Sequence, residues 1–116
     1  KGYRLGLASS STKHDILKAL EETNLKDYFS VILSGEEFEK GKPHPAIYQE
    51  ARRQLGFSNA ETLVIEDSEK GIQAGVSAEL TVWAIEDNLF DMNQRKASRL
   101  VKNLAQIVEI LEEKTY

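Results

Sequence analysis

Short apolar segments alternate with segments of helical periodicity along the chain, and this alternation restricts the possible folds more than any other feature. Five segments have the character of β-strands, at residues 3–9, 30–34, 62–65, 80–85 and 99–101. Helical periodicity is found at residues 13–22, 45–55 and 69–76, and again from residue 104 onward. Strands that alternate with helices at this spacing predict βαβ units. We therefore expect an α/β fold, a three-layer, doubly wound parallel sheet with helices on both faces.

The apolar runs indicate that this sheet is buried on both sides. The runs VIL, LVI and LTVWAI are continuous rather than alternating, as strands covered by helices on both faces require. A chain of 116 residues can bury one such core, so residues 1–116 are expected to form a single domain. In sheets of this kind, ligands bind beyond the carboxyl ends of the strands. The residues that follow each strand are therefore the candidates for function.

Composition narrows the classes of partner. The net charge of −4 argues against nucleic acid, so an anionic ligand would need positive charge supplied locally. The chain has no cysteine, which excludes a disulfide scaffold and fits a cytoplasmic location. No segment approaches the run of about 20 apolar residues that spans a membrane. The chain begins at Lys1 and its single methionine is Met92, so we expect it to be a piece of a longer protein.

A cluster of hydroxyl residues follows the first strand. Ser9, Ser10 and Ser11 stand between that strand and the start of a helix. Their hydroxyls and the main-chain N–H groups of such a turn can bind an anion, assisted by the helix dipole. The alternative is a purely structural role, since Thr12 followed three residues later by Asp15 is typical of a helix cap.

The loop after the second strand contains a lysine between a glycine and a proline. Lys42 lies in the sequence Gly41-Lys42-Pro43-His44, a rigid turn that gives its long side chain a fixed base. An ammonium group there can bind a phosphoryl oxygen or a neighbouring carboxylate. A solvated surface lysine is the alternative. We interpret His44 as a polar loop residue and His14, near the start of the first helix, as a surface residue.

Two adjacent carboxylates follow the third strand. Glu66 and Asp67 end an apolar run, where negative charge is costly unless something positive neutralises it. Mg²⁺, which prefers oxygen ligands, is the natural candidate. Ser68 is a plausible N-cap for the next helix. Gly71 and Gly75 are expected to allow close packing of that helix.

The remaining polar groups are expected to be solvated, and this applies to the cluster Glu86-Asp87-Asn88 after the fourth strand. Trp83 is expected to belong to the core. Four basic residues are expected to form a solvated face: Arg95, Lys96, Arg99 and Lys102.

Taken together and in this order, three motifs are more specific than any one alone. They are LASSS after the first strand, GKPHPAIY after the second, and LVIEDSEKGIQAG across the third. Nearly the whole chain resembles the haloacid dehalogenase superfamily of phosphatases and phosphomutases. Within that superfamily it looks most like the subfamily of β-phosphoglucomutase and its phosphatase relatives, which have a Rossmann-like core.

The resemblance implies a role for five residues. Ser9 matches the hydroxyl that binds the phosphoryl group, and Ser10 adds a backbone contact. Lys42 matches the lysine that steadies the nucleophile and the transferring phosphoryl group. Glu66 and Asp67 match the acidic pair that completes the magnesium site, with Asp67 the surer ligand. The implied substrate is a small phosphorylated metabolite, of the sugar-phosphate type.

The chain also departs from the family pattern. His44 stands where relatives often have a small residue, and Ala78-Glu79-Leu80 stands where many have Ala-Gly-hydrophobic, which leaves the substrate open. No Asp-x-Asp occurs in these 116 residues, although the family's first motif supplies the nucleophilic and acid/base aspartates in that form. The resemblance therefore implies that this chain is the C-terminal part of the core. The first strand and the helical cap would lie upstream of Lys1, and the isolated chain would be inactive.

Two classes of protein are alternatives to an enzyme. One is a non-catalytic module that binds phosphate or Mg²⁺, or an interaction domain that retains the fold. The other, a phosphoacceptor receiver domain, is rejected because its paired acids should follow the first strand, where this chain has serines. The choice between hydrolase and mutase stays open, because it depends on the cap.

The missing strand also predicts which strands pair. Residues 3–9 should pair with 30–34, and 62–65 with 80–85, but 3–9 should not pair with 62–65.

Overall fold

The computed structural model describes residues 3–86 and 94–113. Five strands are present among them: β1 Leu5–Ser9, β2 Phe29–Ser34, β3 Leu63–Glu66, β4 Thr81–Ile85 and β5 Arg99–Val101. The α-helices are α1 Lys13–Thr23, α2 Ala46–Leu55, α3 Glu69–Ser77 and α4 Leu104–Glu113. Every predicted strand and helix is therefore confirmed, to within two residues at the ends that were predicted. The sequence analysis missed three short 3₁₀ helices: η1 Lys26–Tyr28, η2 Gly35–Glu37 and η3 Asn59–Glu61.

The strands form two parallel sheets rather than one continuous sheet. β1 pairs with β2 in one sheet, and the other sheet has the order β3-β4-β5. The predicted pairings are confirmed, including the absence of pairing between β1 and β3 within the part of the chain that the structure describes. Each of these two strands consequently keeps one edge without a strand partner there.

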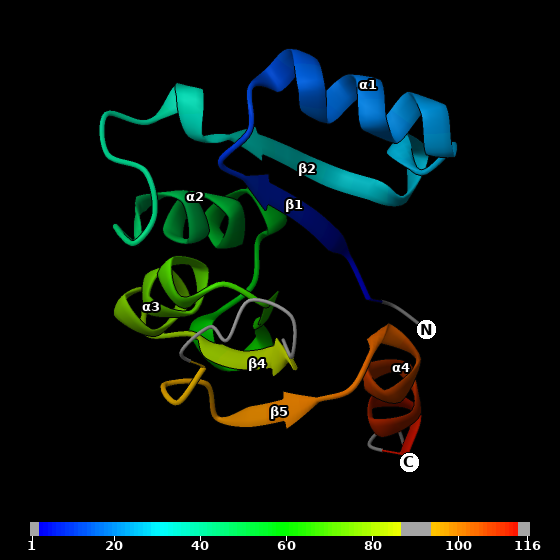
Figure 1. The fold of residues 1–116 in the computed structure, drawn as a ribbon, viewed down its shortest axis with the longest axis vertical. Helices are drawn as coiled ribbons and strands as arrows, with labels where there is room; N and C mark the ends of the chain where they lie inside the picture. Colours follow the sequence, from blue (N-terminus) through cyan, green and yellow to red (C-terminus); the bar gives the residue numbers. More distant parts are fainter. Residues whose placement is uncertain (1–2, 87–93, 114–116) are drawn as a thin grey trace.

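Helices on one side join the two sheets. Figure 1 shows α2 and α3 next to each other on one side of the strands, while α4 lies on the other side. A single buried cluster combines Val31 and Leu33 of β2, Ile47 of α2, Ile72 of α3 and Val82 of β4, among others. The two sheets are thus held together through this shared helical layer, although their strands do not pair.

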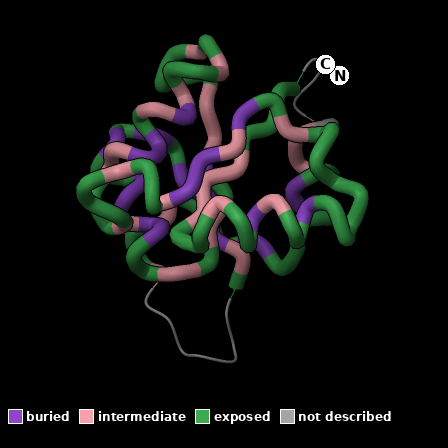
Figure 2. Tube along the Cα trace, turned by 90° about the horizontal axis from the view of Figure 1, so that it is seen from above, coloured by how far each residue is buried: buried purple, intermediate pink, exposed green. Residues whose placement is uncertain are grey.

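The second face of the larger sheet has its own core. Trp83 of β4 packs with Val101 of β5 and Ile107 of α4. Neighbouring residues of β4 therefore face different clusters, since Val82 belongs to the α2–α3 side and Trp83 to the α4 side. This explains why the strand is continuously apolar, and it confirms Trp83 as a core residue. Along the helices, buried positions alternate with exposed ones (Figure 2).

Polar residues at the helix starts behave as predicted. The Thr12 hydroxyl accepts a hydrogen bond from Asp15 N at 3.1 Å, and the Ser68 hydroxyl accepts one from Gly71 N at 3.0 Å. Each such N-cap is worth about 1 kcal/mol of stability. Because both caps directly follow candidate functional residues, they also fix where those loops end and the helices begin.

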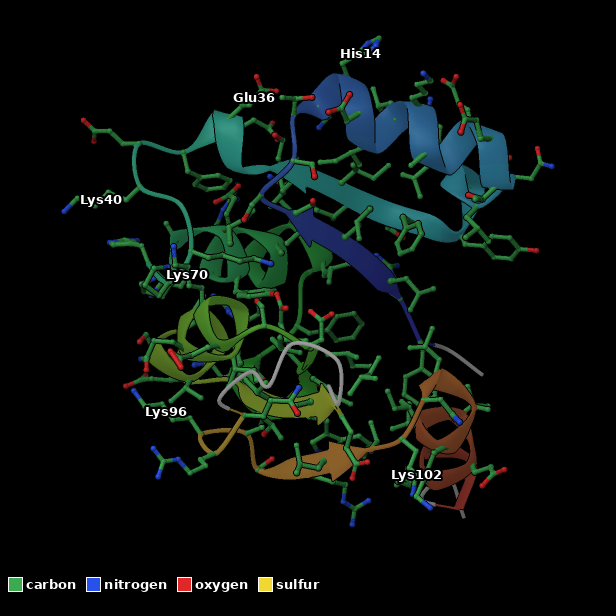
Figure 3. The ribbon with its side chains drawn as sticks, in the orientation of Figure 1. His14, Glu36, Lys40, Lys70, Lys96 and Lys102 are labelled. Carbon is green, nitrogen blue, oxygen red and sulfur yellow. The ribbon has the colours of Figure 1, made fainter. Side chains whose placement is uncertain are left out.

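The basic residues near the C-terminus are exposed, as expected: Arg95, Lys96, Arg99 and Lys102. Figure 3 shows Lys96 and Lys102 on the outer surface, and the Arg99 guanidinium also lies over the Trp83 ring, 5.0 Å from its centroid. Asp87 and Asn88 lie outside the described residues. Within the described ranges, no helix combines the length and the apolar character that crossing a membrane would need.

Candidate active site

A cleft of about 1190 Å³ lies between the two sheets. The residues lining it include both β1 and β3, so it follows the edges of these two strands that have no strand partner among the described residues. All five predicted site residues also line this cleft: Ser9, Ser10, Lys42, Glu66 and Asp67. They come from the ends of β1 and β3 and from the loop after β2. The structure thus brings these residues together, while their chemical roles stay predictions.

Lys42 connects the two sheets at the mouth of the cleft. Its Nζ lies 2.5 Å from Oε2 of Glu66, which ends β3. The same Nζ donates a hydrogen bond of 3.2 Å to the carbonyl of Ala8, one residue before the end of β1. The Lys42 and Glu66 side chains are only 10% and 9% exposed. Lys42 is therefore a buried, paired cation, and the interpretation as a solvated surface lysine does not hold.

Glu66 receives donors on both of its carboxylate oxygens. Oε2 accepts from Lys42 Nζ and from the hydroxyl of Tyr48 in α2. Oε1 accepts a 3.2 Å hydrogen bond from Asp67 N. Burial raises the pKa of Glu66, but the Lys42 ammonium and the hydrogen bonds outweigh it and hold this pKa below its usual range. Glu66 is accordingly an ionised carboxylate with its charge compensated inside the protein.

Tyr48 belongs to the site although the sequence analysis did not select it. Its ring lies under the Lys42 ammonium, with Nζ 5.0 Å from the ring centroid. Burial, with the adjacent charge of Glu66, raises the pKa of Tyr48 well above its ordinary value, so the hydroxyl stays a donor. The available signal was a tyrosine beside the apolar face of the predicted helix 45–55, because a buried tyrosine hydroxyl usually requires a partner.

The serine loop after β1, residues 9–11, is anchored by the last residue of β2. The buried Ser34 hydroxyl donates to the Ser11 carbonyl at 2.7 Å. Ser9 Oγ accepts from Ser11 N at 3.1 Å, which folds the loop back on itself. Backbone packing is close, since a Cβ on Gly35 would lie 3.3 Å from Ser10 Cα. Ser9 and Ser10 are thus presented to the cleft by a fixed turn.

The N-terminus of α1 is partly satisfied within the protein. Glu36 Oε1 accepts from Lys13 N at 2.6 Å, in addition to the cap that Thr12 gives to Asp15. Figure 3 shows Glu36 next to the start of this helix. An anion in the cleft would therefore find its donors on the serine loop and Lys42 rather than on the first turn of α1.

Asp67 differs from its neighbour Glu66. It is exposed, and no described residue donates a hydrogen bond to its carboxylate. Its main-chain carbonyl accepts from Gln94 Nε2 at 2.8 Å, and the same amide donates to the Ile85 carbonyl at 2.7 Å. Gln94, which the sequence analysis also missed, thus ties the Asp67 loop to the end of β4. Within residues 3–86 and 94–113, no group of three or more metal-ligating side chains is assembled.

The two histidines lie away from this chemistry. His44 is exposed, and its Nδ1 accepts a hydrogen bond from Ala46 N at 3.2 Å, close to the start of α2. His14 is exposed on the outer side of α1 (Figure 3). Their interpretations as a polar loop residue and a surface residue agree with these positions.

Most of the chain matches a known protein family. The family of haloacid dehalogenase-like hydrolases matches residues 1–85. The chain belongs to this family.

Curated relatives of this haloacid dehalogenase-like chain include two phosphatases. One is the bifunctional riboflavin kinase/FMN phosphatase of Arabidopsis thaliana, 40% identical over 85 residues, which are 72% of this chain and 22% of the relative. Another is the phosphorylated carbohydrates phosphatase of Thermotoga maritima, 35% identical over 78 residues, which are 67% of this chain and 36% of the relative.

Solved structures share the fold. A structure from Thermotoga maritima with a provisional β-phosphoglucomutase name is 30% identical and superposes with a TM-score of 0.85, over 96% of this chain and 53% of that protein. The chain therefore spans about half of the length of this structure, and less than half of the two phosphatases above. The residues that the family matches, 1–85, contain β1, β3 and the loop that carries Lys42.

Proposed function

We propose that this chain is part of an enzyme that transfers the phosphoryl group of a small phosphate monoester, of the sugar-phosphate type, with Mg²⁺ as cofactor. The observation that carries this proposal is the position of Lys42. Its ammonium stands at the carboxyl ends of β1 and β3, beside two serines and two carboxylates. The phosphatases among the relatives, one of which is named for phosphorylated carbohydrates, support the same reaction class.

The phosphate-binding groups would be those on the β1 side of the cleft. Ser9 and Ser10 offer hydroxyl and main-chain donors, and Lys42 offers positive charge that the net-negative chain needs locally. Lysine has three N–H donors, and Ala8 and Glu66 accept two of those of Lys42. The third can serve a phosphoryl oxygen, where charge must be stabilised during transfer.

The metal-binding groups would be those on the β3 side. Asp67 has an exposed carboxylate without a hydrogen-bond donor among the described residues, which suits a magnesium ligand. Glu66 would contribute beside it, although its Oε2 is already bound by Lys42 and Tyr48. Two carboxylates do not complete a coordination shell, so further ligands must come from outside these two residues. When bound, Mg²⁺ would supply compensation for the negative charge of the phosphate.

The nucleophile would come from a strand that enters the cleft. Both β1 and β3 have a free edge toward it, and the exposed side chains Leu5 and Ile65, 47% and 37% exposed, line it. An apolar strand ending in Asp-x-Asp, located upstream and followed by a cap, fits this gap. Its first carboxylate would attack phosphorus to give an aspartyl-phosphate, while its second, protonated, would give its proton to the ester oxygen as the P–O bond breaks. Water or a second hydroxyl would then release the phosphoryl group.

The test uses the protein that carries this chain and a panel of phosphate monoesters. Wild type should release phosphate from a sugar phosphate with Mg²⁺ and stop when EDTA is added. Asp67→Asn should lose this activity while keeping its fold by circular dichroism, whereas Asp27→Asn, an exposed aspartate in η1, should match wild type. A folded wild type without turnover of any ester would overturn the proposal in favour of a non-catalytic binding module.

A further inference from the structure

We propose that Tyr48 is a positioning residue, which holds Glu66 and Lys42 in the geometry that the phosphoryl-transfer site requires. The inference rests on the proposed function for its catalytic consequence, but its structural basis does not. Tyr48 contacts both members of the buried ion pair. Its hydroxyl donates to Glu66 Oε2, and the face of its ring lies toward the Lys42 ammonium.

The backbone of α3 is a second close neighbour of the Glu66 carboxylate. Gly71, in the first turn of α3, has no side chain where Glu66 lies, and a Cβ there would be 2.0 Å from Glu66 Cδ. The Glu66 carboxylate is therefore enclosed in part by the α3 backbone and the Tyr48 hydroxyl of α2. Helices α2 and α3 also contact each other, so the enclosure is built on two packed elements.

This enclosure fixes the direction of the Lys42 side chain. Glu66 Oε2 accepts from both Tyr48 and Lys42, so the tyrosine hydroxyl sets where the carboxylate oxygen stands and hence where the ammonium is attracted. The Ala8 carbonyl accepts a second N–H of Lys42. Because the ammonium group is tetrahedral, these two hydrogen bonds also fix the direction of the third N–H of Lys42. Without the hydroxyl, the carboxylate can rotate and the ammonium can follow it.

The experiment removes only the hydroxyl. Tyr48→Phe keeps the ring beneath Lys42, and Tyr28→Phe is the matched control on an exposed tyrosine of η1. In the protein that carries this chain, Tyr48→Phe should lower kcat about tenfold and change KM less than about twofold, because a misdirected charge costs most in the transition state. Tyr28→Phe should match wild type. An unchanged kcat, or a loss confined to KM, would overturn the positioning role.

A double-mutant cycle with Glu66→Gln shows whether Tyr48 acts through Glu66. The Tm is measured for wild type, for each single variant and for the double variant Tyr48→Phe/Glu66→Gln. The changes in Tm should be non-additive, because in Glu66→Gln the side-chain amide no longer offers a charged acceptor to the Tyr48 hydroxyl. Additive changes would overturn the proposal. If Tyr48→Phe alone does not fold, recovery of soluble protein in the double variant supports it, and continued failure overturns it. The cycle needs no substrate, so an inactive wild type would contradict the proposed function and leave this result standing.

Discussion

Gly71 leaves the space that the carboxylate of Glu66 occupies, because a Cβ at residue 71 would lie 2.0 Å from Glu66 Cδ. The sequence analysis expected both Gly71 and Gly75 to allow close helix packing. That expectation holds for Gly75, where a Cβ would meet Val82 Cγ2 of β4 at 2.6 Å. At Gly71 the neighbour is instead a charged group of the candidate site, so substitutions of the two glycines should have different effects.

Gly71→Ala should both destabilise the protein and reduce its activity. The added methyl group must displace the Glu66 carboxylate, which we expect to cost up to roughly 3 kcal/mol of unfolding free energy, more than the gain of about 1 kcal/mol in helix propensity. Urea denaturation measures the first effect and kcat the second. Gly75→Ala is the comparison: it should destabilise through Val82 but retain the kcat of wild type per folded molecule. Wild-type kcat in Gly71→Ala would contradict this account of Gly71.

Lys42→Ala should affect turnover more than substrate binding. The ammonium is most useful as negative charge shifts in the transition state, so kcat should fall by at least about 100-fold with a smaller change in KM. The variant also leaves Glu66 buried without its cation, which costs about 3 kcal/mol or more of unfolding free energy. Lys40→Ala, on an exposed lysine of the same loop (Figure 3), controls for charge and should resemble wild type. An effect limited to KM would argue against the transition-state role.

The candidate site could be predicted from sequence where a residue follows a strand. Ser9, Lys42 and Asp67 lie after three successive apolar runs, and parallel strands bring their carboxyl ends to one edge. Tyr48 could not be found in this way, because its place in the site depends on how α2 packs across two sheets. The pairing between Lys42 and Glu66 was predicted only in part, since a carboxylate was one of the two partners expected for Lys42 but Glu66 was assigned to Mg²⁺.

The start of α1 shows the same limit on the fold. Glu36 caps α1 through Lys13 N, a contact between residues 23 positions apart. Local patterns such as the Thr12 cap are visible in the sequence because both partners lie within one turn. A capping group supplied from another strand's loop leaves no such local pattern, so the sequence indicates the helix start but not this second partner.

The pH dependence of one carboxylate on the outer side of α2 can be predicted. Hydrogen bonds from Arg53 and then Gln54 lower the pKa of Glu50 to about 2. This pKa is lower in the folded state than in the unfolded chain, where it is about 4.3. The ionised Glu50 carboxylate therefore stabilises the folded protein above about pH 4.3, and this stabilisation is lost as the pH falls toward 2. An NMR titration of the Glu50 side-chain carboxyl measures this directly. Arg53→Met should raise the Glu50 pKa, and an unchanged titration would refute the assignment to Arg53.

The isolated 116-residue chain should hydrolyse no phosphate ester. Asp-x-Asp is absent from its sequence, so on the proposed mechanism it cannot form the covalent intermediate. The measurement is p-nitrophenyl phosphate hydrolysis by the purified chain with Mg²⁺. Lys42→Ala made in the same chain is the control for contaminating phosphatase, because residual activity that is equal in both does not come from this site. Turnover that Lys42→Ala abolishes would show that the chain carries its own nucleophile.

The same chain should self-associate through the cleft between β1 and β3. Two strand edges face it without strand partners among the described residues, and Leu5 and Ile65 line it with exposed apolar side chains. Unpaired edges of this kind recruit further strands, and a lysine placed on such an edge opposes that. Sedimentation velocity at tens of micromolar should therefore show oligomers for the chain and a shift toward monomer for Leu5→Lys/Ile65→Lys. Leu25→Lys, an equally apolar exposed position before η1, should leave the oligomers unchanged. If Leu25→Lys also dissociated the oligomers, general surface charge would be the cause. If the unsubstituted chain were monomeric, the cleft would not attract a strand.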